Sequence, residues 1–180
     1  MNGEGGRKGN GMNDQNFTRA GVLQLVSFNL GDEEYGVDIL RVQEINRMVH
    51  ITRVPKAPEF VEGVINLRGK VIPIVDLRKR FGLTVKPHDK NTRIIVVDID
   101  GQTVGLIVDG VSEVLRFSMD TIEPPPAMVT GVDAEYIWGV GKLEDRLLIL
   151  LDLSKVLAKE EKDILGESAA MAPEMALAGR

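Results

Sequence analysis

The segment GVINLRGKVIPIVDLRK, residues 63–79, decides the fold because residues 139–155, GVGKLEDRLLILLDLSK, repeat it without a gap. The Gly-Val pair, one Leu, the Asp-Leu pair and the final Lys are identical, and the apolar positions between them match in kind. Each copy alternates like two strands around a polar turn and then begins a short helix. The chain is therefore predicted to build one small β module twice.

The repeat extends upstream, where residues 35–45 align with residues 104–114. The spacing from Gly36 to Gly105 is shorter than the spacing from Gly63 to Gly139, so the second copy carries extra residues between its two parts. The Pro-rich stretch 123–126 lies where those residues fit. Two copies are too few for a solenoid. Strand-turn-strand segments can resemble one another by chance, but the ungapped Asp-Leu-x-Lys ending favours duplication.

Composition sets the kind of core. The chain has 180 residues, of which 43% are hydrophobic and only 4% aromatic, so Val, Ile and Leu must fill the interior, as suits strands. Modules of about 65 residues are marginally stable alone. The two modules are therefore expected to share a hydrophobic interface.

Charge and cysteine content exclude several classes of function. The net charge of −5 argues against a nucleic-acid binder, which needs clustered Lys and Arg. The absence of cysteine excludes disulfides, thiolate metal sites and Cys nucleophiles. The N-terminus lacks a signal-peptide pattern, and the longest apolar run, 147–151, is far shorter than a membrane span. A cytoplasmic protein without direct membrane insertion is expected.

The predicted fold class is mainly β, in short strands separated by turn signals. Residues 1–21 are Gly-rich and lack apolar periodicity, so disorder is predicted there, and residues 159–180 are predicted to hold a helix end and a flexible tail. The double domain between them is placed at 22–158, with modules at about 22–90 and 91–158, and strand exchange between the modules is left open. Strands are predicted at 23–30, 35–39, 42–45, 64–67, 70–76, 93–99, 102–108, 111–117, 137–143 and 146–152, and helices at 77–81 and 153–162.

Catalytic, cofactor and metal constellations are not found in the sequence. His50 and His88 are read as solvated loop residues, and no phosphate-binding loop is present. Asp98-x-Asp100-Gly101 resembles the start of a calcium loop but is better read as a hairpin turn. The acidic turn 32–34 is read as solvated. An enzyme needs positioned acids, bases or a metal, so a non-enzymatic protein without a cofactor is predicted.

Surface features for partners remain. Arg68 lies at the tip of the first repeated hairpin, where it is either an ordinary exposed Arg or a bidentate anchor for a carboxylate. Arg78, Lys79 and Arg80 form a basic helix edge, which is usually solvated or complements the helix C-terminus. Val42 and Val114 could be core residues or an apolar patch, and core is the default interpretation. These alternatives are open at the level of the residues.

Four ordered motifs resemble the bacterial chemotaxis coupling protein family CheW. They are GDEEYGVDI at 31–39 with VQEI at 42–45, GVINLRG at 63–69 with IPIVDLR at 72–78, VDGVSEV at 108–114, and DRLLILLD at 145–152. The resemblance covers residues 23–157, about three quarters of the chain. The Gly-rich start and the Ala/Met-rich end lie outside it.

The resemblance implies two small five-stranded β-barrels packed on a shared hydrophobic interface, with short helices after the barrel hairpins and at the C-terminus. It also implies a non-enzymatic adaptor that couples methyl-accepting chemoreceptors to the histidine kinase CheA. The partners would be the regulatory domain of CheA and the cytoplasmic tip of the receptors, with a monomer in isolation that assembles in membrane-associated arrays. The family's receptor groove falls on Val42, Glu44, Gly63, Arg68, Gly105 and Val114.

Two other functions compete with this one. The chain could couple a different chemosensory array, which sequence cannot distinguish. It could instead be a small-ligand-binding β-barrel that uses the Arg78-Lys79-Arg80 edge for a nucleotide or sugar. An enzyme is a third class and would need an acid–base pair that the sequence does not supply.

Overall fold

The computed structural model describes residues 21–125, 134–157, 161, 165 and 166. The predictions for residues 1–20 and 167–180 lie outside this part of the chain. None of the described helices is long and apolar enough to cross a membrane. The elements are β1 Val22–Leu30, β2 Glu33–Asp38, β3 Val42–Arg47, β4 Val61–Leu67, β5 Lys70–Asp76, α1 Leu77–Arg80, β6 Arg93–Ile99, β7 Gln102–Val108, β8 Gly110–Ser118, β9 Ile122–Glu123, β10 Ile137–Lys142, β11 Leu147–Leu151 and α2 Leu153–Val156.

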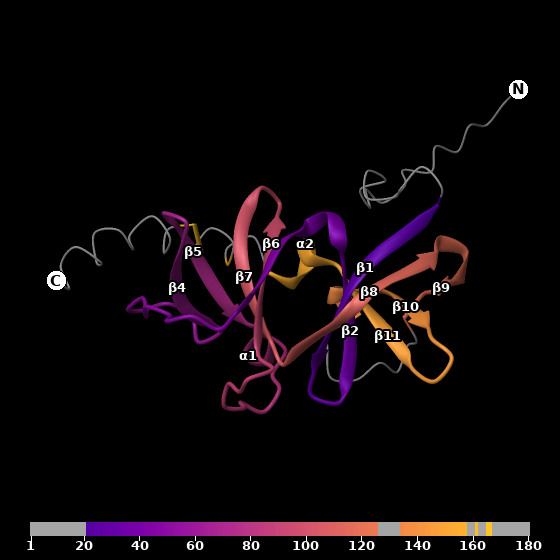
Figure 1. The fold of residues 1–180 in the computed structure, drawn as a ribbon, viewed down its shortest axis with the longest axis horizontal. Coiled ribbons are helices and arrows are strands. Elements are labelled where there is room, and N and C mark those ends of the chain that lie inside the picture. Colours follow the sequence, from indigo (N-terminus) through magenta and orange to yellow (C-terminus); the bar gives the residue numbers. More distant parts are fainter. Residues whose placement is uncertain (1–20, 126–133, 158–160, 162–164, 167–180) are drawn as a thin grey trace, which may run out of the picture.

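The strands form two sheets that lie side by side (Figure 1). Sheet A has the order β8-β1-β2-β11-β10-β9, and sheet B has the order β3-β6-β7-β5-β4. The mainly β prediction is confirmed, but sheet A has six strands because the two-residue β9 is separate from β8.

Each sheet curls so that the chain leaving one edge strand reaches the other edge strand. In sheet B, Thr52 follows β3 and forms an antiparallel bridge with Val64 of β4. In sheet A, Glu123 of β9 follows β8 and pairs with Val140 of β10. The sheets therefore approach barrels of five strands, each closed by a short bridge and not by full strand pairing.

The two halves of the sequence exchange their strands. Sheet A takes β1 and β2 from the first copy and β8 to β11 from the second. Sheet B takes β6 and β7 from the second copy and β3 to β5 from the first. Neither copy forms a sheet by itself.

The strand register repeats together with the sequence. The parallel contact that joins the copies pairs Ile74 with Gly105 in sheet B and Leu150 with Gly36 in sheet A. Both repeated hairpins have a register shift just before the repeated glycine, at Val61/Gly63 and Ile137/Gly139. Both following helices are capped by the repeated aspartate, whose side chain accepts a backbone N–H two residues later; these residues are Asp76 and Asp152.

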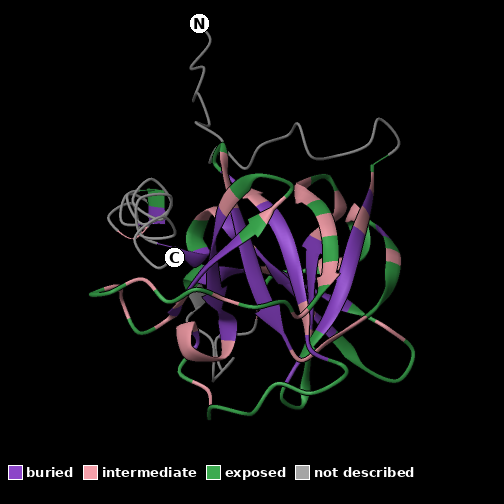
Figure 2. Ribbon diagram, turned by 60° about the vertical axis from the view of Figure 1, so that its left-hand side comes forward, coloured by how far each residue is buried: buried purple, intermediate pink, exposed green. Residues whose placement is uncertain are grey.

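Three apolar clusters hold the molecule together, and most of the buried residues that build them lie on the strands (Figure 2). In β6, the side chains of Ile94 and Val96 join the cluster inside sheet B, whereas those of Ile95 and Val97 join the cluster shared with sheet A. This period of two is what a strand packed on both faces requires. The shared cluster also holds a row of rings, Phe28, Tyr35, Phe81 and Tyr136, with centroids 5.7–6.0 Å apart.

The second helix is shorter than predicted. α2 ends at Val156, and Leu157 has an extended backbone with φ −118° and ψ 134°. Leu157 is 2% exposed and belongs to the shared cluster, so its burial outweighs the local preference to continue the helix. The predicted single helix over 153–162 is therefore wrong at Leu157, where it is interrupted; residues 158–160 and 162 lie outside the described residues.

Candidate functional site

The hairpin between β4 and β5 presents Arg68 at its tip. Arg68 and Gly69 have φ of 53° and 83°, and both values lie in the left-handed region used by two-residue hairpin turns. The Asn66 side chain accepts the Gly69 N–H at 2.9 Å and fixes the turn. Arg68 therefore projects from a rigid hairpin, with its side chain 79% exposed.

Arg68 reaches across to β3 and pairs with Glu44. Its Nη1 donates to Glu44 Oε2 at 2.9 Å, and the Asn46 side chain donates to Glu44 Oε1 at 2.7 Å. Glu44 is held more firmly than Arg68, because its side chain is only 20% exposed. An exposed ion pair is worth about 0–1 kcal/mol, so a partner carboxylate can draw the guanidinium away at little cost.

Exposed apolar side chains flank this ion pair along the sequence. Leu40 lies just before β3, Ile45 lies beside Glu44, and Val49 follows the strand; they are 61%, 41% and 49% exposed. Glu44 lies opposite Val96 and Ile45 lies opposite Ile95, and these two partners belong to different clusters, so Glu44 and Ile45 point to opposite sides of the strand. Because β3 is an edge strand of sheet B, side chains on both of its sides are accessible to a partner that meets the edge. We call Leu40, Glu44, Ile45, Val49 and Arg68 the β3 edge.

Leu40, Ile45 and Val49 were missed from the sequence. Alternation along the strand would not have found Ile45, because β3 has a register shift between Val42 and Glu44. Val42 lies opposite Val97 and Ile45 lies opposite Ile95, and both partners belong to the shared cluster. Val42 and Ile45 therefore lie on the same side of the sheet, Val42 partly buried against the shared cluster and Ile45 exposed.

Val114 lies on the other sheet. It is part of β8, pairs with Val26 of β1 and is 55% exposed. The default interpretation of a core residue is therefore wrong for Val114, whereas Val42 packs against the edge of the core.

Gly63 and Gly105 are buried within sheet B and shape its interior. Gly63 has φ +145°, and a Cβ there would lie 2.1 Å from the Thr52 carbonyl oxygen. A Cβ on Gly105 would lie 2.4 Å from Ile74 Cδ1. A side chain at either glycine would therefore act on a partner through displaced strands, since neither residue offers side-chain surface of its own.

The basic edge of α1 is used inside the molecule. Arg78 pairs with Asp109, and Lys79 pairs with Glu62. Arg80 pairs with Glu161 and donates from Nε to the Val156 carbonyl at 2.8 Å. Of the two interpretations of this edge, the solvated face is therefore wrong, and the ligand-binding alternative loses the cations on which it depended.

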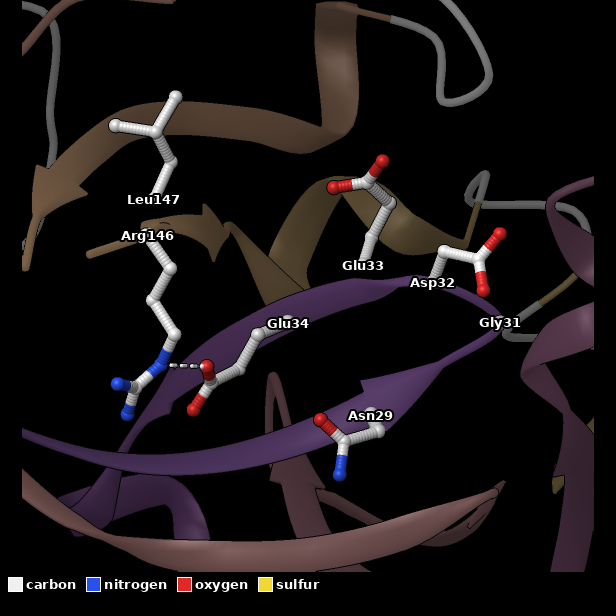
Figure 3. Close-up of a pocket in the computed structure, with 7 residues that line it drawn as sticks. All are labelled: Asn29, Gly31, Asp32, Glu33, Glu34, Arg146 and Leu147. Carbon is white, nitrogen blue, oxygen red and sulfur yellow. Dashed lines mark hydrogen bonds and ion pairs between the residues drawn. The ribbon is translucent and has the colours of Figure 1, made fainter.

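A hollow of about 440 Å³ lies beside the β1–β2 turn (Figure 3). The Arg146 guanidinium spans its wall, with Nε donating to Glu34 Oε2 and Nη2 donating to Glu113 Oε1 at 3.1 Å. Nη1 donates to Asp145 Oδ1 at 3.0 Å, and the bonds to Glu34 and Asp145 raise the pKa of Arg146. The lining residues are Asn29, Gly31, Asp32, Glu33, Glu34, Arg146 and Leu147.

Metal ligation and histidine chemistry find no support in the described ranges. No group of three or more His, Cys, Asp or Glu side chains there could hold a metal ion. His50 and His88 are both exposed, as expected of loop histidines.

Comparisons with known proteins agree with this architecture. A family model described as "CheW-like domain" matches residues 24–161. The chain is 42% identical over 146 residues to a chemotaxis protein CheW of Klebsiella aerogenes, covering 81% of this chain and 88% of the relative. It is 37% identical over 154 residues to the CheW of Treponema pallidum, covering 83% and 87%.

A solved structure is similar as well. The scaffolding protein TtCheW from Thermoanaerobacter tengcongensis superposes with a TM-score of 0.72 and 44% sequence identity, covering 77% of this chain and 94% of that one. The likeness spans both sheets and most of each sequence. The chain belongs to the CheW-like domain family.

Proposed function

We propose that this chain is a non-enzymatic adaptor that couples methyl-accepting chemoreceptors to the histidine kinase CheA. A chemotaxis coupling or scaffold role follows from membership of the family. The proposal adds the two partners, a cytoplasmic location and recruitment to receptor arrays at the membrane.

The observation that carries the proposal is the β3 edge. It combines three exposed apolar side chains, from residues before, in and after β3, with an Arg68 guanidinium whose present partner holds it weakly. A helix docks on such a surface through apolar side chains, while the Arg binds a carboxylate at the edge. The rigid hairpin turn lowers the entropy that Arg68 would lose on binding.

The six residues proposed for receptor binding divide into two roles. Arg68, Glu44 and Val114 offer accessible atoms to a partner. The other three would hold the strands beneath those residues in place, because they are buried or packed against the core; they are Gly63, Gly105 and Val42. Substitutions in the second group should reduce binding and stability together.

The adaptor contributes coupling free energy and no chemistry. Couplings between sites are typically about 1–3 kcal/mol. Individual affinities near micromolar, about −8 kcal/mol, suit an array in which many weak contacts act together.

Receptor binding is tested with a helical hairpin that contains the receptor's cytoplasmic tip. Arg68→Glu should weaken binding by about 2 kcal/mol or more if Arg68 is a central anchor. Lys142→Glu is the matched control, since Lys142 also forms an exposed ion pair, with Glu123 at 2.8 Å, on the hairpin of the other sheet. Equal binding by the wild type and Arg68→Glu, with both folded, would remove Arg68 from the receptor site.

Kinase binding is tested separately by calorimetric titration of the purified CheA regulatory domain. Saturable one-to-one binding at low micromolar affinity or better is expected. No heat and no co-elution, with both proteins folded, would contradict the kinase part of the proposal and leave the receptor part to be judged on its own.

A further inference from the structure

The chain crosses between the two sheets at repeat-related points. The first crossover runs from β2 to β3 through the short 3-10 turn Ile39–Arg41, and the second runs from β7 to β8 through Asp109. Leu40 follows Gly36 at the same interval at which Asp109 follows Gly105, the glycine that matches Gly36 in the second copy. The two crossovers can therefore be compared position by position.

An ionic hub holds the second crossover. Asp109 Oδ1 accepts Arg78 Nε at 2.7 Å, and Oδ2 accepts the Gly31 N–H at 2.8 Å and also pairs with Arg78 Nη2. Arg78 Nη1 donates to the Thr84 carbonyl at 2.7 Å. The side chains of Arg78 and Asp109 are only 14% and 16% exposed.

The hub joins both sheets to the crossover. Arg78 lies in α1, directly after β5 of sheet B, whereas Gly31 lies in the β1–β2 turn of sheet A. Bidentate Arg–carboxylate pairs fix geometry in two directions, and separating a largely buried pair leaves a charge without its partner. The sheets therefore resist movement relative to each other at this point.

Among the described residues, the first crossover has a side-chain hydrogen bond where the second has the ionic hub. Leu40 occupies the place of Asp109 and is 61% exposed. Ser154 occupies the place of Arg78, since each directly follows the repeated Asp-Leu pair, and its hydroxyl donates to Asp100 Oδ1 at 2.9 Å. The duplicated architecture is thus clamped by an ion pair at one crossover and not at the other, among the residues that the structure describes.

We infer that the hub of Arg78, Asp109 and Gly31 sets the relative orientation of sheets A and B, as a one-sided clamp. When the angle between the sheets changes, sheets A and B rotate about the second crossover and move apart at the first, beside Leu40. Arg78 and Asp109 are positioning residues that act through the sheets. This role of the hub does not depend on the proposed partners. In an adaptor, the angle between the sheets would fix how two bound partners face each other.

A pair of spin labels measures the angle directly. The chain has no cysteine, so cysteines introduced at exposed Lys70 and Glu144, one at the tip of each repeated hairpin, label one site in each sheet. With no other substitution, the distances between the two labels should form one narrow distribution. Asp109→Asn should shift and broaden it, and Arg78→Lys, which keeps the charge but loses the second parallel bond, should broaden it less.

Lys79→Met is the matched control. Lys79 lies on the same helix, but its partner Glu62 belongs to sheet B, so its loss should leave the distribution unchanged. A folded Asp109→Asn variant with the wild-type distribution would overturn the inference, and so would equal broadening by Lys79→Met. If Asp109→Asn does not fold, Arg78→Lys is compared with Lys79→Met instead. Broadening by Arg78→Lys alone supports the inference, and equal distributions for the two variants overturn it.

Discussion

At the scale of single residues, Gly36 and Gly105 show how one repeated position can carry different constraints. A Cβ on Gly36 would lie 3.1 Å from a terminal methyl of Leu148, which can shift a little. A Cβ on Gly105 would lie 2.4 Å from Ile74 Cδ1 and 2.9 Å from Ile94 Cγ2. Two side chains meet each position, but both lie nearer at Gly105 than Leu148 and Leu150 do at Gly36, so the second position has less room.

Gly105→Ala should therefore destabilise the fold by about 1–3 kcal/mol, the range for overpacked cores. Gly36→Ala, the repeat-related control, should cost less. Urea denaturation of both variants measures the difference in free energy of unfolding. If Gly36→Ala proves the more damaging of the two, the tight packing around Gly105 is not the constraint described here.

Asp109 gives the fold a pH dependence with a definite sign. Burial alone would raise the pKa of Asp109, but hydrogen bonds from the Arg78 guanidinium and the Gly31 N–H outweigh it and hold the pKa below its usual range. A carboxyl with a lowered folded pKa stabilises the protein above its unfolded pKa, about 3.9, and this stabilisation is lost as pH falls through the folded pKa.

Asp109→Asn should consequently be less stable than the wild type at pH 7, with a difference that shrinks below about pH 4. Burial raises the pKa of Asp38 and of Asp76, which gives the opposite slope, but both groups are present in both proteins and cancel in the comparison. Urea midpoints measured from pH 7 to pH 3 provide the test. A difference independent of pH would show that the Asp109 charge is not what stabilises the hub.

At the scale of elements, Arg80 joins the two short helices. It lies over the rings of Phe60 and Tyr136 at 5.5 and 5.1 Å, and these aromatic residues are themselves repeat-related. Its Nε caps α2 by donating to the Val156 carbonyl. Cation–π contacts and charged hydrogen bonds each contribute about 0.5–3 kcal/mol.

Arg80→Met keeps much of the side-chain volume but removes the guanidinium, and should lower stability by about 1–3 kcal/mol. Lys155→Met is the control on α2, because Lys155 is 58% exposed and its pair with Asp152 is long, at 3.9 Å. Thermal denaturation of both variants distinguishes the two. Equal midpoints would mean that Arg80 does not hold the helices together.

Local features of these elements could be predicted from the sequence. The helix starts at Leu77 and Leu153 were predicted, and in the structure the Asp76 and Asp152 side chains cap them by accepting the N–H two residues on. Asp100-Gly101 marked a hairpin turn, and both residues have positive φ. The end of α2 could not be predicted, because Leu157 leaves the helix to fill a core built by distant strands.

At the scale of the whole molecule, strand exchange makes each sheet depend on both halves of the chain. Unfolding one half removes strands from both sheets, so unfolding should be a single cooperative transition. Trp138, the sole Trp, reports on sheet A, while far-UV circular dichroism reports on both sheets. The two signals should give the same urea midpoint; separate midpoints would mean that the sheets unfold independently.

Contacts between distant segments are what the sequence did not reveal. A repeated hairpin can pair within its own copy or across copies with the same local pattern, so the repeat alone left strand exchange open. The same reason hid the partner of Arg78, because Asp109 lies on the other copy of the repeat. For the candidate site, Arg68 was placed correctly at a hairpin tip, but the burial of Gly63 and Gly105 depends on Thr52 and Ile74, which only the fold brings near.

The central claim is that one chain bridges two partners, and a three-component sedimentation assay tests it most directly. Immobilised receptor-tip hairpins are mixed with the CheA regulatory domain, with and without this chain. We expect the kinase domain to sediment with the receptor only when the chain is present, and Arg68→Glu to abolish this while Lys142→Glu does not. Retention of the kinase domain that is unaffected by the chain, or binding of the chain to one partner without recruitment of the other, would contradict the account.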